Sequence, residues 1–229
     1  MNSSVQTFAN RTMAGVELGH AIRQRGLEAP AIVLGLPRGG VPVAFEIARI
    51  IGATLDVLPV RKIGLPDNPE LAVGAIAGRT IVRERNGALE VPTRIFADMA
   101  RVQRAELRRR ERAYRAGLPP LNLKGQEVLL VDDGLATGCT MLAAVREADR
   151  LGATRILVAV PIASDGGHAL VRAEANEVIA LRIEPHLSSV GEWYEDFSQV
   201  EDSAVCELLT RSRGAYGRVH LEIRPDTRS

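Results

Sequence analysis

The chain has 229 residues, of which 46% are hydrophobic and 25% are charged, and its formal net charge is +1. This is the composition of an ordinary folded α/β-sized domain, and the near-zero net charge argues against binding of nucleic acid or anionic membranes through bulk charge. No apolar run approaches the roughly 20 residues that cross a bilayer, the N-terminus lacks a signal-peptide pattern, and two cysteines cannot build a disulfide framework. We therefore expect a cytoplasmic protein with no membrane partner.

Short apolar runs alternate with segments of helical periodicity along most of the chain. The first helix is expected at residues 8–25, with buried positions at Met13, Val16, Leu18, Ala21 and Ile22. The other helices are expected at residues 41–52, 93–116, 140–151 and 167–175. The strands are expected at residues 31–36, 54–60, 73–77, 80–85, 128–132, 155–163 and 177–183. This alternation is typical of a doubly wound, mainly parallel sheet with helices on both faces.

The alternation of strands and helices stops near Glu184. We therefore expect residues 1–183 to form an α/β core, and residues 184–229 to form a small cap and a C-terminal extension of the same domain. In the tail, the alternating residues Val219, Leu221 and Ile223 predict one added edge strand.

Two acids and a loop of small residues follow the strand in the stretch VLLVDDGLATGCT, residues 128–140. In a doubly wound sheet, ligands bind beyond the carboxyl ends of the strands, where this stretch places Asp132 and Asp133. Small residues at 136–140 let backbone N–H groups approach an anion at the start of the next helix, which suits a phosphate monoester. The carboxylates suit hydroxyl groups or a hydrated divalent cation. Together these features describe a site for a phosphorylated sugar.

Other interpretations of this stretch are weaker. Acids at a strand end often only cap the next helix, but here they come with the small-residue loop at a fixed spacing. A P-loop requires a lysine directly after Gly138, and a phosphoacceptor receiver domain requires a lysine further downstream. The last lysine of the chain is Lys124, so both of these classes are excluded by residue type.

The stretch resembles the signature of the type I phosphoribosyltransferases, which bind 5-phosphoribosyl diphosphate (PRPP). In that family the two acids contact the ribose 2- and 3-hydroxyls, roles that fall here on Asp132 and Asp133. The residues that the resemblance assigns to the 5-phosphate are Ala136, Thr137, Gly138, Cys139 and Thr140. Members often have glycine in place of Cys139, and a thiol at this position is predicted to be sensitive to oxidation.

A second glycine turn, in GLPRGGVPVA, follows the first expected strand. Its free backbone N–H groups and one guanidinium offer an anion site, although an arginine in such a turn is commonly just solvated. Its placement resembles the pyrophosphate loop of the same family, which often contains a strained peptide bond. The resemblance implies that Arg38, Gly39 and Gly40 hold the diphosphate of PRPP.

The stretch VRKIGLPDNPELAVGAIA, after the second expected strand, contains one of only two lysines in a chain with 29 basic residues. Lys62 is a compact point charge that suits a phosphate oxygen, with a chance surface lysine as the equal alternative. The segment resembles an uncharacterised phosphoribosyltransferase-like subgroup. There Glu70 lies near the cleft and is a candidate contact to metal or substrate, or else simply an acid at a helix start.

The expected helix at 93–116 carries eight arginines between residues 94 and 115. Acids lie among them, and the pairs Glu106–Arg110 and Glu111–Arg115 have i,i+4 spacing. This favours a solvated, salt-bridged helix over an RNA-binding face, because aromatic residues are scarce and the chain has no basic excess. We do not expect nucleic acid as a partner.

Three of the eight aromatic residues fall in HLSSVGEWYEDF: Trp193, Tyr194 and Phe197. In the family, a variable C-terminal hood covers the acceptor base, and this string resembles the hood of the uncharacterised subgroup. At least one ring is expected to stack on an acceptor and one to fill the core.

The resemblance covers residues 10–210 and implies a type I phosphoribosyltransferase fold, with a five-stranded, mainly parallel sheet and a small C-terminal hood. It implies transfer of the phosphoribosyl group from PRPP to a nitrogen of a base-like acceptor, with Mg²⁺ as cofactor and a homodimer as the assembly. The expected catalytic residues are Asp132, Asp133, Arg38 and Lys62, and the expected metal contacts are Asp132 and Asp133, directly or through water, with Glu70. The alternative is a regulator that senses PRPP or a nucleotide on the same fold without turnover.

Overall fold

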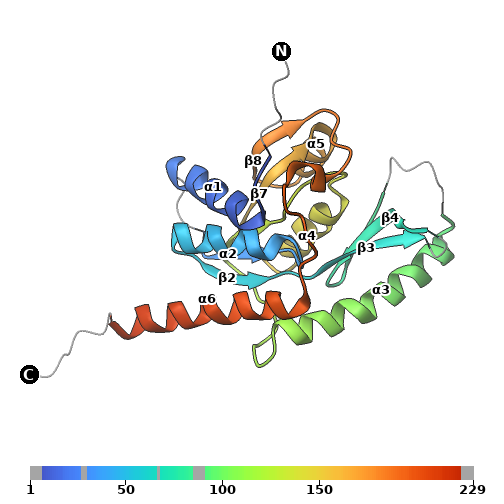
Figure 1. Ribbon diagram of the computed structural model, residues 1–229. Coiled ribbons are helices and arrows are strands. Elements are labelled where there is room, and N and C mark those ends of the chain that lie inside the picture. The colour runs from blue at the N-terminus through green and yellow to red at the C-terminus, as the bar shows by residue number, and fades with distance from the viewer. Residues whose placement is uncertain (1–6, 27–29, 66–67, 85–90, 223–229) are drawn as a thin grey trace, which may run out of the picture.

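A computed structural model describes residues 7–26, 30–65, 68–84 and 91–222, and for residues 69–71 and 215–222 it describes the backbone alone (Figure 1). Five strands form one parallel sheet in the order β2-β1-β6-β7-β8. Their bounds are Ile32–Gly35 for β1, Thr54–Val57 for β2, Glu127–Val131 for β6, Arg155–Ser164 for β7 and Glu177–Glu184 for β8. The predicted five-stranded, doubly wound sheet is therefore confirmed.

Strand order reverses between β1 and β6. From β1 the chain goes outward to β2 on one side, and later returns to place β6 on the other side. The carboxyl ends of these two strands therefore lie side by side, each followed by a different loop. This is the place where a doubly wound sheet offers a binding crevice.

Helices cover both faces of this sheet. One apolar cluster joins the sheet to α1 (Arg11–Gln24), α2 (Gly40–Ile51) and α6 (Asp202–Glu222), and these helices lie together on one side in Figure 1. The other face packs on α4 (Cys139–Arg150) and on Val171 of α5 (Asp165–Arg172). The strands β1, β6 and β7 are almost fully buried, which explains why their sequences are continuous apolar runs without alternation. The edge strand β8 is mostly half-buried.

The packing of α1 on α2 corrects the predicted buried face. Met13 is 45% exposed, and Val16 and Ala21 are only half-buried, whereas Leu18 and Ile22 are buried as expected. Gly15 and Gly19 lie against α2 instead: a Cβ on Gly15 would come within 2.8 Å of the Val43 carbonyl oxygen. Glycine at these two positions therefore allows α1 to pack on α2, because the two helix backbones are too close for a side chain between them.

A separate three-stranded antiparallel sheet lies beside the main sheet. It contains β3 (Val60–Leu65), β4 (Asn68–Ala77) and β5 (Thr80–Arg83), in that order. The sequence predicts strands in this region, although not that they form a sheet of their own. The small sheet packs against α4 and against α3 (Thr93–Tyr114), and Phe96 of α3 contributes to its core.

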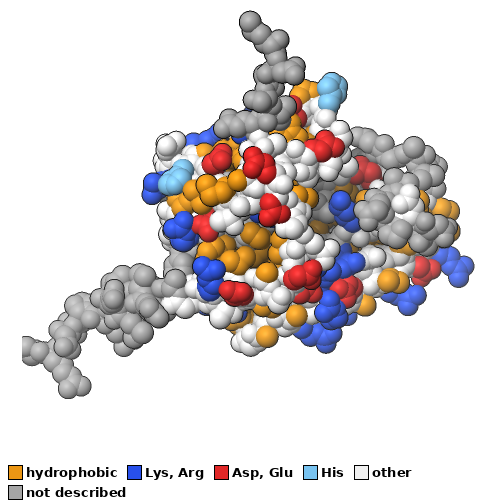
Figure 2. All heavy atoms as spheres, viewed as in Figure 1, with side chains coloured by type: hydrophobic (Ala, Val, Ile, Leu, Met, Phe, Trp, Pro, Cys, Tyr) orange, Lys and Arg blue, Asp and Glu red, His pale blue; other side chains and the backbone are white. Residues whose placement is uncertain are grey.

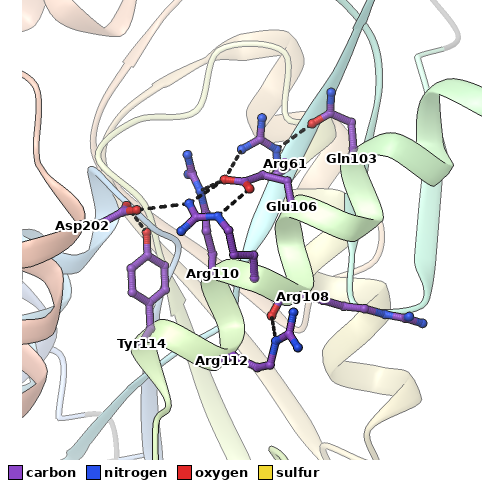
Figure 3. A network of polar contacts seen from close by, with 9 residues as sticks. Arg61, Gln103, Glu106, Arg108, Arg110, Arg112, Tyr114 and Asp202 are labelled. Atoms are coloured by element: carbon purple, nitrogen blue, oxygen red, sulfur yellow. Dashed lines mark hydrogen bonds and ion pairs between the residues drawn. The ribbon is translucent and has the colours of Figure 1, made fainter.

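The arginine-rich helix α3 is held by ion pairs (Figures 2 and 3). Figure 2 shows basic side chains over α3 with acidic side chains among them. Glu106 pairs with Arg110 at 3.0 Å, as predicted, and also with Arg109 at 2.7 Å (Figure 3). The predicted Glu111–Arg115 side-chain pair does not form, because the Arg115 guanidinium is buried against Asp56, with Nη2 3.0 Å from Oδ2. α3 is therefore a salt-bridged helix, as predicted, but Arg115 at its C-terminal end pairs with Asp56 and not with Glu111.

The C-terminal segment differs from the sequence prediction. After β8 comes a short 3-10 helix, η1 (Val190–Trp193), and then the long helix α6. The predicted edge strand is wrong: Val219 and Leu221 lie in α6, while Ile223 lies outside the described residues. None of the helices in the described ranges is long and apolar enough to cross a membrane.

Candidate active site

Two loops meet at the crevice between β1 and β6. The Leu36 N–H donates to the Val131 carbonyl at 2.8 Å, which ties the β1 loop to the end of β6. A Cβ on Gly40 would lie 2.5 Å from the same carbonyl oxygen, and a Cβ on Gly39 would overlap Asp133 Oδ2. The two glycines of the predicted pyrophosphate loop are thus needed for it to touch the acid pair. The peptide bond between Pro37 and Arg38 is cis.

The two aspartates lie at the carboxyl end of β6 in unequal surroundings. The Asp133 N–H donates to Asp132 Oδ1 at 2.9 Å. Burial, and next the negative charge of Asp133, raise the pKa of Asp132 well above its usual range, while the positive charge of Lys62 acts in the opposite direction. Asp133 instead forms an ion pair with Arg11, whose Nε lies 2.7 Å from Oδ2. The two carboxyl groups therefore differ, because only that of Asp133 has a cation in direct contact among the described residues.

The small-residue loop leads into α4 as the sequence predicts. Gly138 has a φ of +81°, a conformation that favours glycine, and α4 begins at Cys139. Across the described residues, no recorded hydrogen bond uses the backbone N–H of Thr137, Gly138 or Thr140. The hydroxyl of Ser164, the last residue of β7, donates to the Ala136 carbonyl and thereby anchors the loop. The loop thus presents unpaired N–H groups at a helix N-terminus, as an anion site requires.

The remaining predicted cations lie around these loops. Arg38 pairs with Glu201, with 3.7 Å between Nη1 and Oε2. Lys62 lies on β3 with an exposed side chain, close enough for its charge to lower the pKa of Asp132. Glu70 lies within β4, but its side chain is outside the described residues.

The hood is attached directly to the acid pair. Tyr194 is buried, and its hydroxyl donates to the Asp133 carbonyl at 2.6 Å, so this ring fills the core. Phe197 stacks beside it, with ring centroids 5.0 Å apart, and stays 37% exposed, while Trp193 is half-buried. Phe8 bridges to this segment through backbone hydrogen bonds with Trp193 and Glu195. Of the three rings, Phe197 and Trp193 remain available to an acceptor.

Arg11 is the site residue that the sequence analysis misses. It is the first residue of α1, directly after the N-cap Asn10, and nothing in its local sequence marks it as more than a surface arginine. Its partner Asp133 is 122 positions away in the chain. Only the packing of α1 across the end of the sheet brings the two together.

A cavity of about 1250 Å³ lies on the other side of the small-residue loop. Its lining comes from β4, β5, the start of α3, α4 and α5, and includes Ala136, Thr137 and Cys139 but neither aspartate. Burial, and next the charge of Glu84, raise the pKa of the Cys139 thiol to about 12. Because the thiolate is the reactive form, a raised pKa favours a slowly reacting thiol, and the predicted sensitivity to oxidation stays a prediction. The cavity is also lined by charged side chains, among them Arg83, Glu84 and Arg146, so polar groups lie on both sides of the loop.

A magnesium ion would find two protein carboxylates here. Within the described part of the chain, no cluster of three or more His, Cys, Asp or Glu side chains is placed to hold a metal. Asp132 and Asp133 nevertheless fit Mg²⁺, since this ion keeps several waters and is commonly bound by one or two carboxylates together with substrate phosphates.

Known proteins share this architecture. Residues 14–198 match the phosphoribosyl transferase domain family. Two proteins from strains of Mycobacterium tuberculosis, provisionally named phosphoribosyl transferases, are 41% identical over 212 residues, which is 91% of this chain and 47% of theirs. The chain thus spans about half the length of these relatives. The crystal structure of TT1426 from Thermus thermophilus is 43% identical, with a TM-score of 0.73 over 90% of this chain and 98% of that one. The chain therefore belongs to the phosphoribosyl transferase family, a family of pentosyltransferases.

Proposed function

We propose that the protein transfers the 5-phosphoribosyl group of PRPP to a nitrogen of a base-like acceptor and releases pyrophosphate, in a magnesium-dependent reaction. One observation carries the proposal: the acid pair, the loop before α4 and the Pro-Arg-Gly-Gly loop converge where β1 and β6 end. These three groups match the ribose hydroxyls, the 5-phosphate and the diphosphate of a single ligand.

In this reaction the bond from C1 of the ribose to the diphosphate oxygen breaks, and a bond from C1 to the acceptor nitrogen forms. The transition state resembles an oxocarbenium ion, so the site needs to hold a departing diphosphate anion more than to supply a nucleophile. The Gly39–Gly40 backbone and Arg38 would bind the diphosphate and stabilise its growing charge. A bound Mg²⁺ would add further neutralisation of the diphosphate.

The other groups bind and orient the sugar. Asp132 and Asp133 would accept hydrogen bonds from the ribose hydroxyls, and their negative charge would lie near the positive charge that grows on the ring. The N–H groups before α4 would hold the 5-phosphate, supplying binding energy remote from the reacting carbon. Lys62 would contribute a point charge near Asp132, as its effect on that carboxyl supports. Phe197 and Trp193 would cover the acceptor.

The test is pyrophosphate release from PRPP and magnesium with a panel of purines, pyrimidines and orotate. We expect turnover with at least one acceptor. Asp133→Asn should reduce PRPP affinity about tenfold to a hundredfold, because a hydrogen bond to a charged group contributes roughly 1.5–3 kcal/mol. Asp98→Asn, at an exposed acid of α3 that pairs with Arg101, is the matched control. Full PRPP affinity in Asp133→Asn would reject the assignment.

A second candidate is a sensor that binds PRPP or a nucleotide without turnover. The same acid pair and loops suit binding alone, because the proposed reaction uses no nucleophile from the protein. Metal-dependent PRPP binding without pyrophosphate release on any acceptor would select the sensor over the enzyme.

We also propose that the protein works in the cytoplasm, because both of its cysteines are unpaired, and that it works as a homodimer. Light scattering coupled to gel filtration measures the second property directly.

A further inference from the structure

The side chain of Arg11 joins three parts of the site. Its Nε lies 2.7 Å from Asp133 Oδ2, and its Nη1 donates to the Ser198 carbonyl at 2.8 Å. The guanidinium carbon lies 3.7 Å from the centre of the Phe197 ring, within the range of a cation–π contact. The side chain is only 12% exposed. One guanidinium thus contacts the acid pair and the hood at the same time.

The backbone under Arg11 is held from several directions. Asn10 caps α1 by accepting from the Met13 N–H, and the Asp196 N–H donates to the Ala9 carbonyl. Two glycines of α1 seat the helix tightly on α2, which itself begins at Gly40 of the pyrophosphate loop. Arg11 therefore lies at the start of a helix that packs on α2, and α2 begins in the loop that would bind the diphosphate. A rigid base of this kind is what a positioning side chain needs.

The ion pair leaves one oxygen of Asp133 for a ligand. Oδ2 is taken by Arg11, whereas no hydrogen bond recorded among the described residues reaches Oδ1. A Cβ on Gly39 would overlap Oδ2 and lie 3.1 Å from Arg11 Nε, so the pair is seated against the pyrophosphate loop. The carboxylate therefore has little freedom to rotate, and the compensating cation offsets the repulsion from Asp132.

We propose that Arg11 is a positioning residue, which fixes the Asp133 carboxylate so that Oδ1 meets a ribose hydroxyl, and which couples that contact to the hood through Ser198 and Phe197. This role rests on the proposed function, because it assumes that the ligand of Asp133 is the ribose of PRPP. It extends the site to the N-terminal helix, which the family signature in residues 128–140 does not include.

The test compares Arg11→Gln and Arg11→Lys with Arg23→Gln. Arg23 lies on the same helix, is exposed, and makes its side-chain contact with His20, which makes it a matched control. Arg11→Gln should weaken PRPP binding about tenfold to a hundredfold, the range expected for a lost charge-assisted hydrogen bond. Arg11→Lys should recover part of this loss, since it keeps the charge without the fork geometry. Arg23→Gln should stay within about twofold of wild type.

Two readouts separate positioning from a general loss of structure. In the proposed site, inorganic pyrophosphate would bind through the loop of Arg38, Gly39 and Gly40. Its affinity should therefore change less than about twofold in Arg11→Gln, because Arg11 acts on the ribose contact. In an Asp133→Asn background, removing Arg11 should cost little more PRPP affinity, because the two residues act as one unit. Equal loss of pyrophosphate and PRPP affinity, or additive effects of the two substitutions, would overturn the positioning role.

The outcome for wild type distinguishes the two proposals. If the wild-type protein binds no PRPP, the proposed function fails and this role fails with it. If wild type binds PRPP and Arg11→Gln binds it equally well, only the role of Arg11 is rejected. Where an acceptor has been found, its KM should rise in Arg11→Gln while Arg23→Gln keeps the wild-type value, because the contact with Phe197 is lost.

Discussion

The loop at residues 136–140 lies between two regions of the molecule, the closely packed acid pair and a large cavity. On one side, the acid pair, two glycines and Arg11 lie in close contact around the ends of β1 and β6. On the other side is a cavity of about 1250 Å³ with the buried Cys139 thiol in its lining. The cavity and the acid pair are separate features, since neither aspartate lines the cavity. We place the candidate site at the acid pair, because there the backbones of the two loops approach each other closely.

The largest effect is expected on the cavity side, at Cys139. With a thiol pKa of about 12, the thiolate fraction at pH 8 is about a thousandfold below that of an ordinary cysteine. Alkylation by iodoacetamide, followed by mass spectrometry, should therefore be slow at Cys139 and faster at the less buried Cys206. Because the thiolate is the rare form, the rate at Cys139 should rise about tenfold per pH unit between about pH 8 and pH 11. A fast reaction at pH 8 whose rate levels off above about pH 9.5 would mean that the thiol has the pKa of a cysteine in water, and it would weaken the contrast.

A smaller but still large effect is expected from a methyl group at the crevice. Gly40→Ala places a Cβ against the Val131 carbonyl and the Asp132 backbone, which cannot yield as a flexible side chain would. We expect a loss of about 1–3 kcal/mol in the free energy of unfolding, measured by urea denaturation, and weaker PRPP binding.

The control for this change lies on the cavity side. A Cβ on Gly166, in the first turn of α5, would meet nothing within 4 Å. Gly166→Ala should leave stability unchanged or raise it by up to about 1 kcal/mol. If both substitutions destabilised the protein equally, the close approach of the two loops would not be the cause.

The smallest effect is expected at the edge of the site. Glu201 is exposed, and its pair with Arg38 is long, so the pair itself contributes little stability. Glu201→Gln should nevertheless raise the affinity for inorganic pyrophosphate by a few-fold, because Arg38 no longer has a competing carboxylate. Isothermal titration calorimetry at low salt measures this change. Weaker pyrophosphate binding would mean that Glu201 orients Arg38 and does not compete for it.

Much of the site was predictable because its motifs are contiguous. Asp132, Asp133 and the loop before α4 follow one another directly, and a strand that ends in acids and small residues implies its own local geometry. The same holds for Gly39 and Gly40 after β1. The parallel sheet with helices on both faces followed from the regular alternation of apolar strands and helices, whereas the number of five strands came from the family resemblance.

Other features could not be predicted from local patterns. The sequence indicates strands near Val73 and Thr80, but their pairing into a separate antiparallel sheet depends on partners outside each segment. The tail alternates over only three residues, at 219–223, and the helix that continues from Asp202 overrides this short signal. Met13 was expected to be buried, but glycines on its helix turn a different face toward α2.

The fold class and the two glycine-containing loops of the candidate site follow from the sequence alone, because strand periodicity and loop composition are encoded in neighbouring residues. The contact of Arg11 with Asp133, the burial of Tyr194 beside the exposed Phe197, and the pair of Arg115 with Asp56 depend on tertiary packing. Each of these contacts joins residues far apart in the chain. The energy of such a contact depends on interatomic distances of a few ångströms, and the sequence of either segment alone does not specify these distances.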